Sequence, residues 1–146
     1  MSGWGQRVFT GVRHLQVLVV DDDSAICELI ADILGDVGVA TLCAANDREA
    51  YAALDREETV TAVVVDLNLR EGTTGFDVAR AARAKLPALD VLYISGESSD
   101  ASFRRFGVEG SRCLFKPFTA SELLAALGLA ERGTPGSASR SSASAF

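Results

Sequence analysis

The sequence predicts one α/β domain built on a parallel sheet of five strands. Three observations predict this fold class: five short apolar, β-branched runs, the longer segments of helical period that alternate with them, and a length of 146 residues. Regular alternation of strands and helices is typical of parallel sheets, because a helix must return the chain to the same end of the sheet. A chain of this length can form one core and is too short for two.

The first strand is predicted over residues 15–20, with a helix directly after it. The run is almost continuously apolar, as expected for a strand that is buried on both faces, and it ends on three consecutive aspartates, residues 21–23. Ser24 is predicted to cap the helix, because its side chain can accept a hydrogen bond from a free N–H of the first turn. Apolar residues then recur at helical spacing from Ile26 to Leu34.

A second strand is predicted over residues 39–45, and a second helix follows it to about Arg56. Asn46 and Glu49 have the spacing of a capping box, in which each side chain accepts a hydrogen bond from the other residue's N–H. The third strand, residues 61–65, is the most strand-like stretch of the chain.

The third strand ends on Asp66, and a loop containing glycine leads to a helix predicted over residues 76–86. Pro87 ends this helix, because a proline ring is not accommodated inside a helix. The fourth strand is predicted over residues 91–94 and ends at Ser95.

The fourth helix is predicted to be capped by one of the serines at 98–99, with Phe103 and Phe106 facing the core. The fifth strand, residues 112–115, runs directly into Lys116.

The last helix is predicted to begin at a second capping box. Thr119 and Glu122 have the required spacing, and the leucines within residues 123–127 lie on the side predicted to be buried. Residues 1–13 are predicted to be a flexible arm and residues 132–146 a disordered tail, because the tail is mostly Gly, Ser and Ala. The folded domain is therefore expected over 14–131.

The charge balance excludes some partners. Lys and Arg number 14 against 20 Asp and Glu, a net charge of -6, whereas binding nucleic acid through its phosphates needs clustered basic residues. No apolar run approaches the 18 or so residues that span a bilayer, and the N-terminal residues do not resemble a signal peptide. We therefore expect no nucleic-acid or membrane partner and a cytoplasmic protein.

The three cysteines, Cys27, Cys43 and Cys113, are isolated in apolar sequence and are predicted to be reduced core thiols.

Polar side chains gather where the predicted strands end. The aspartates at 21–23, Asp66, Ser95 and Lys116 follow the first, third, fourth and fifth strands, and ligands of open parallel sheets bind at the carboxyl ends of strands. Two carboxylates about 4 Å apart repel by roughly 4 kcal/mol at an effective dielectric of 20, so a cation must offset the repulsion. Oxygen ligands of this kind suit magnesium, and a lysine suits an anionic oxygen.

Four short motifs at these strand ends, taken together, carry a family resemblance. They are Val-Leu-Val-Val-Asp-Asp-Asp at 17–23, Val-Val-Val-Asp-Leu-Asn at 63–68, Tyr-Ile-Ser-Gly at 93–96 and Leu-Phe-Lys-Pro-Phe at 114–118. Their order and spacing resemble the receiver domain of bacterial two-component response regulators, from about residue 15 to 130. The resemblance implies a flavodoxin-like fold with strand order 2-1-3-4-5.

The resemblance also implies a role for each site residue. Asp66 would accept a phosphoryl group from a partner's phosphohistidine, and Asp21, Asp22 and Asp66 would hold Mg²⁺ or Mn²⁺ together with the backbone carbonyl of Asn68. Ser95 and Lys116 would contact the phosphoryl oxygens. The peptide bond before Pro117 would be cis.

The sequence departs from the family at a position that matters for signalling. Receivers usually carry an aromatic residue three positions before the lysine, which turns inward on phosphorylation, and Cys113 stands there. The usual switch is therefore not expected in its common form.

The resulting interpretation is a stand-alone response regulator that signals by phosphorylation-dependent protein–protein interaction or in a phosphorelay. It is expected to catalyse only its own phosphorylation and dephosphorylation. Its expected partners are a sensor histidine kinase or histidine phosphotransfer protein, and a downstream protein that docks on the fourth helix, fifth strand and fifth helix. One alternative is a receiver-like docking module that is never phosphorylated, which Cys113 favours. Another is a phosphohydrolase with an aspartate nucleophile, although that class expects Thr or Val where Ala25 stands.

Overall fold

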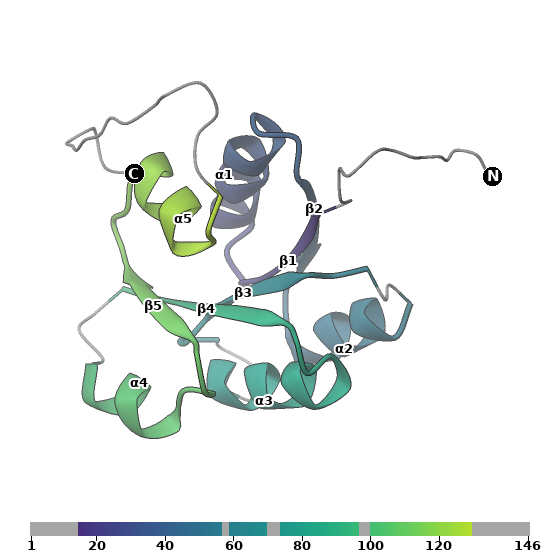
Figure 1. Cartoon of the computed structure of the whole chain (residues 1–146), viewed down its shortest axis with the longest axis vertical. Coiled ribbons are helices and arrows are strands. Elements are labelled where there is room, and N and C mark those ends of the chain that lie inside the picture. Colours follow the sequence, from purple (N-terminus) through teal and green to yellow (C-terminus); the bar gives the residue numbers. More distant parts are fainter. Residues whose placement is uncertain (1–14, 57–58, 70–73, 97–99, 130–146) are drawn as a thin grey trace.

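Five parallel strands form the central sheet of the computed structural model, which describes residues 15–56, 59–69, 74–96 and 100–129 (Figure 1). Their order is β2-β1-β3-β4-β5, which confirms the order expected from the resemblance. The strands are β1 (Gln16–Val20), β2 (Ala40–Ala44), β3 (Ala62–Asp66), β4 (Asp90–Ser95) and β5 (Arg112–Phe115).

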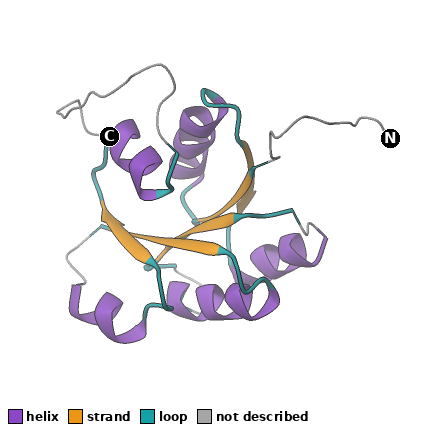
Figure 2. Cartoon of the chain, in the orientation of Figure 1, coloured by secondary structure: helices purple, strands orange, loops and turns teal. Residues whose placement is uncertain are grey.

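Helices cover both faces of this sheet, so the domain has three layers (Figure 2). α1 and α5 lie on one face, and α2, α3 and α4 lie on the other. The helices are α1 (Ser24–Gly35), α2 (Asp47–Arg56), α3 (Gly75–Lys85), α4 (Asp100–Phe106) and α5 (Ala120–Ala126).

Alternate residues of each central strand enter different cores. Val17 and Val19 of β1 pack with α1 and α5, whereas Leu18 and Val20 pack with α2 and α3. β3 lies between β1 and β4, and all five of its residues are buried. Burial on both faces explains why these strands are continuous apolar runs, and it directs the polar residues of the strands to their ends.

The helix caps correct two sequence predictions and confirm a third. Asp23, rather than Ser24, caps α1, and its carboxylate accepts a hydrogen bond from the Ala25 N–H at 3.0 Å. The helix starts one residue earlier than predicted because aspartate caps as well as serine does. The capping box at Thr119 is present in full.

The predicted box at the start of α2 is formed only in part. The Asn46 side chain accepts the Glu49 N–H at 2.9 Å, but the Glu49 carboxylate accepts the Ala45 N–H at 2.8 Å instead of that of Asn46. Side chains therefore still accept backbone N–H groups at the start of α2, but Glu49 bonds the residue before the N-cap instead of the N-cap itself.

The prediction for α4 is wrong at one residue. Phe103 packs against the core beside α3, as predicted, but Phe106 is 46% exposed. α4 has seven residues, and Phe106 is its last, so its ring lies at the rim of the core. The predicted cap at 98–99 and the predicted arm and tail lie outside the described residues. No helix among the described residues is long and apolar enough to cross a membrane.

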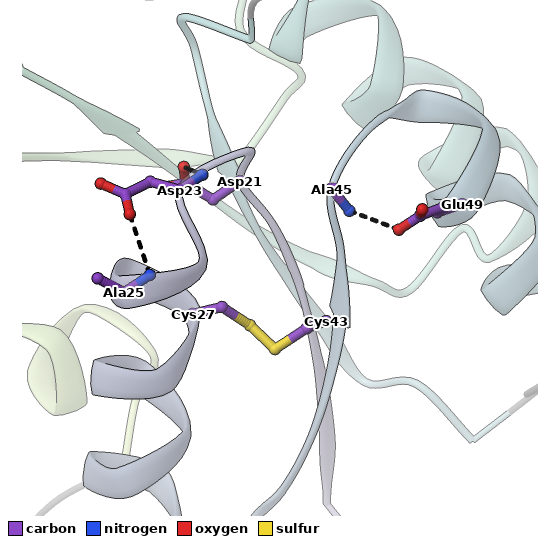
Figure 3. The surroundings of a disulfide bond; sticks show 7 residues. All are labelled: Asp21, Asp23, Ala25, Cys27, Cys43, Ala45 and Glu49. Carbon is purple, nitrogen blue, oxygen red and sulfur yellow. Dashed lines mark hydrogen bonds between the residues drawn. A yellow bond between two sulfur atoms is a disulfide. The ribbon is translucent and has the colours of Figure 1, made fainter.

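Two cysteines are not the free thiols that the sequence predicts. A disulfide joins Cys27 of α1 to Cys43 of β2, and their Cα atoms are 6.2 Å apart, within the range that disulfides span (Figure 3). Helix α1 packs against β1 and β2, so its inward face brings Cys27 to the edge strand. Cys113 is not part of a disulfide and is half-buried.

Candidate functional site

Three aspartates meet at the carboxyl end of the sheet. Asp21 directly follows β1 and Asp66 ends β3, and these two strands are hydrogen-bonded neighbours. One carboxylate oxygen each from Asp21, Asp22 and Asp66 lie within 4.8 Å of one another. Asp21 and Asp66 are buried and Asp22 is exposed, so the cluster opens toward solvent on one side.

Backbone hydrogen bonds hold the two buried carboxylates in place. The Asp21 carboxylate accepts the Asp23 N–H, and the Asp66 carboxylate accepts the Asn68 N–H, each at 2.9 Å. The Asp21 N–H also donates to the Ala44 carbonyl of β2 at 3.0 Å. Each aspartate therefore fixes the turn that follows its own strand, and the two turns lie side by side.

Lys116 follows β5, the edge strand beside β4, and reaches the same cluster with its side chain. Its backbone N–H donates to the Ser95 carbonyl at 2.8 Å, which ties the end of β5 to the end of β4. Its ammonium nitrogen lies 3.9 Å from an Asp21 carboxylate oxygen. The Lys116–Pro117 peptide bond is cis, as the resemblance implies, and Ser95 is fully buried at the end of β4.

The electrostatics of the cluster are those of a cation site. Burial raises the pKa of Asp21 to about 6, and the negative charges of Asp66 and Asp22 add to this effect, against the opposing effects of the Asp23 N–H and Lys116. One lysine therefore does not compensate the three carboxylates. An oxygen-only donor set with surplus negative charge fits Mg²⁺, which takes one or two carboxylates and keeps water in its other positions.

Every site residue predicted from the sequence is described, and the structure brings the three aspartates and Lys116 together. Asn68 lies in the turn after β3 and binds Asp66 through its N–H. The part assigned to its carbonyl stays a prediction, as do the roles of Ser95 and Lys116 toward a phosphoryl group.

Cys113, which stands where receivers usually carry an aromatic residue, has an aromatic neighbour on the adjacent strand. Cys113 pairs in register with Tyr93 of β4, whose ring is fully buried. The Tyr93 ring lies 5.1 Å from that of Phe76 and 5.8 Å from that of Phe103, and its hydroxyl accepts the Val108 N–H at 3.1 Å. An aromatic residue therefore lies next to the Cys113 position, on β4 instead of β5. Sequence reasoning missed it because a tyrosine inside an apolar strand gives no signal of its neighbours.

Gly75 is a second residue whose importance the sequence does not reveal. It is the first residue of α3, and a Cβ there would overlap the Asp66 carbonyl oxygen and lie 3.1 Å from both the Asp66 carbonyl carbon and the Leu67 Cα. Only a glycine lets α3 approach the backbone of the candidate phosphoacceptor this closely.

Gly75→Ala should therefore destabilise the domain by about 1–3 kcal/mol, the usual cost of forcing atoms into a packed site. Gly35→Ala is the matched control, because Gly35 ends α1 and has no atom within 4 Å of an added Cβ. That variant should be stabilised by about 0.5–1 kcal/mol, since alanine loses less backbone entropy than glycine. Urea unfolding measures both. Equal effects of the two substitutions would contradict the close approach of α3 to Asp66.

Together, the doubly wound sheet and the acidic cluster at its switch point define a flavodoxin-like domain with a candidate site at the carboxyl ends of its strands. The family described as "Response regulator receiver domain" matches residues 17–128. The chain belongs to this family, as the four motifs indicate.

Known proteins of this family match in sequence and in fold. The chemotaxis protein CheY of Pseudomonas aeruginosa is 32% identical over 75% of this chain and 90% of its own length. A receiver protein of Sinorhizobium medicae superimposes with a TM-score of 0.73 and 28% identity, covering 78% of this chain and 91% of that one. CheY4 of Vibrio cholerae gives a TM-score of 0.70 and 28% identity, covering 78% of this chain and 96% of that one.

Some relatives are much longer proteins. A putative NtrX-like response regulator of Rickettsia conorii is 31% identical over 77% of this chain, but the match covers 24% of the relative. The receiver fold is thus shared between short proteins and proteins with further domains.

Proposed function

We propose that this chain is a phosphoacceptor that receives a phosphoryl group on Asp66 from the phosphohistidine of a sensor histidine kinase or histidine phosphotransfer protein. The observation that carries the proposal is the convergence of Asp66 with Asp21, Asp22 and Lys116 at one end of the sheet. A carboxylate nucleophile, a cation site and a lysine are the parts that phosphoryl transfer needs from a protein.

Asp21, Asp22 and Asp66 would hold Mg²⁺ or Mn²⁺, with the Asn68 carbonyl as the fourth protein ligand. The chemistry that such an ion supplies when bound is neutralisation of the charge on the phosphoryl oxygens. The buried position of Asp66 and its bond to the Asn68 N–H fix the direction of its carboxylate.

In the transfer step, an Asp66 carboxylate oxygen bonds to phosphorus, the phosphorus–nitrogen bond of the phosphohistidine breaks, and its electron pair stays on the imidazole. The Lys116 ammonium and the Ser95 hydroxyl bind the phosphoryl oxygens and stabilise the charge that spreads over them. Attack of water on phosphorus later returns Asp66 to its carboxylate. The chain thus acts on its own phosphoryl group and turns over no separate substrate.

The partner surfaces follow from the same proposal. The kinase or phosphotransfer protein reaches Asp66 at the carboxyl end of the sheet, and a downstream protein docks on α4, β5 and α5. Phe106 of α4 and Phe115 of β5, which are 46% and 39% exposed, support this second surface as a place for a protein partner. The proposed setting is the cytoplasm.

Beryllofluoride, a stable mimic of a phosphoryl group on aspartate, tests the proposal. In the presence of Mg²⁺ it should shift the amide resonances of Asp66 and its neighbours, and of α4 and β5, and omission of Mg²⁺ should remove the effect. An unchanged spectrum with both reagents present would overturn the phosphoacceptor and favour the docking module that Cys113 suggests.

A further inference from the structure

The disulfide lies beside the candidate site rather than in a remote part of the fold (Figure 3). Cys27 is in the first turn of α1, where its N–H donates to the Asp23 carbonyl at 3.3 Å. Cys43 directly precedes Ala44, whose carbonyl accepts the Asp21 N–H. The covalent link therefore joins the two backbone segments that hold the turn at residues 21–23.

The two cysteine residues differ in their exposure to solvent. Cys27 is buried against the sheet and 5% exposed, whereas Cys43 is an exposed residue on β2, which is an edge strand. Exchange requires that an incoming thiolate reach one sulfur in line with the bond, and access decides which sulfur is attacked. Cys43 is the more exposed residue of the two, so we assign the attack to its sulfur.

We propose that Cys27 and Cys43 form a thiol–disulfide exchange site, whose co-reactant is a dithiol and its disulfide, and whose redox state sets the affinity of the acid cluster for its divalent cation. The second half of this inference rests on the proposed function. In the cytoplasm, which is the setting of the proposed function, disulfides are transient and redox-sensing more often than structural, and this supports the assignment.

The exchange is a balanced two-electron reaction. A thiolate of the dithiol attacks the Cys43 sulfur, the bond to Cys27 breaks, and the Cys27 sulfur leaves with the electron pair and takes up a proton. The second thiolate of the dithiol then attacks the other dithiol sulfur, which is bonded to Cys43 in the mixed disulfide. Cys43 is released as a thiolate and is protonated. The protein gains two electrons and two protons, and the dithiol becomes a disulfide.

The link reaches the acid cluster through the first turn of α1. Asp23 caps this turn through Ala25, and the N–H of Asp23 binds the Asp21 carboxylate. With the disulfide intact, the turn is fixed to β2 covalently at Cys27 and by the hydrogen bond at Asp21, so the Asp21 and Asp22 carboxylates are held ready for a cation. Reduction removes the covalent link and leaves the hydrogen bond to Ala44 and the packing of α1 on the sheet. The carboxylates then lose part of their order and must regain it when the cation binds, which lowers affinity.

The exchange is tested on the whole chain by equilibration with mixtures of reduced and oxidised dithiothreitol, followed by alkylation and peptide mass spectrometry. Cys27 and Cys43 should be protected together and released together along one two-electron titration curve, while Cys113 is alkylated throughout. Alkylation of Cys27 and Cys43 in fully oxidised buffer would overturn the site.

The coupling is tested by measuring Mn²⁺ binding, by electron paramagnetic resonance, to the oxidised and reduced protein. Reduction should weaken binding roughly fivefold, the lower end of usual coupling between sites. A Cys27→Ala, Cys43→Ala double variant should bind like the reduced protein in both buffers. Equal affinities of the oxidised and reduced protein would overturn the coupling. Absence of Mn²⁺ binding in both forms would instead overturn the metal site of the proposed function, while the thiol titration still decides the exchange.

Discussion

Replacement of Asp66 by asparagine should abolish phosphoryl uptake from acetyl phosphate in the presence of Mg²⁺. The carboxylate at the end of β3 is the proposed nucleophile, and an amide oxygen lacks the negative charge that forms the bond to phosphorus. The fold should survive, because the asparagine side chain can still accept the hydrogen bond from the Asn68 N–H that Asp66 accepts. Intact-protein mass spectrometry measures the loss as the missing mass of one phosphoryl group.

Asp90→Asn is the matched control for this experiment. Asp90 is an exposed aspartate at the amino end of β4, the opposite end of the sheet from the cluster, and the substitution makes the same change in charge. It should leave phosphoryl uptake unchanged. If the Asp66→Asn protein were labelled as fully as the wild type, the acceptor would be another residue.

The strands could be predicted closely because their signal is local. β5 begins and ends where predicted, since Arg112 and Lys116 limit a short apolar run. The error at α1 is of one residue, and it arose because Asp23 and Ser24 are both good capping residues and only the backbone conformation decides between them. The prediction that Phe106 faces the core is wrong because helical spacing does not show where a helix reaches the end of the sheet that it covers.

The acid cluster could also be predicted, because the topology of a parallel sheet brings every strand's carboxyl end to one edge. The residues around the cluster could not. Gly75 matters only because α3 returns to the Asp66 carbonyl, and Tyr93 only because it pairs with Cys113. The disulfide escaped prediction for the same reason, since the two cysteines are 16 residues apart and meet through the packing of α1 on the sheet.

Asp21→Asn should change stability and cation binding in opposite directions. Burial and the neighbouring Asp66 and Asp22 raise the pKa of Asp21 from 3.8 to about 6, so the folded protein prefers the neutral carboxyl group more than the unfolded chain does. The stabilisation from the neutral form is fully present below pH 3.8 and is lost as the pH rises through about 6. At pH 7 without metal, the neutral asparagine should therefore stabilise the domain by about 3 kcal/mol, since one pKa unit corresponds to about 1.4 kcal/mol.

Urea unfolding in a metal chelator at pH 7 and pH 4 measures this effect. The difference between variant and wild type should be large at pH 7 and small at pH 4, where Asp21 of the folded wild type is neutral and the pH is near the unfolded pKa of 3.8. Addition of Mg²⁺ at pH 7 should stabilise the wild type and leave the variant almost unchanged, because binding to the folded state alone raises its stability. Asp90→Asn, with the same change in charge far from the cluster, should show neither effect. A variant only as stable as the wild type at pH 7 would mean that burial beside Asp66 and Asp22 does not disfavour the charged form of Asp21.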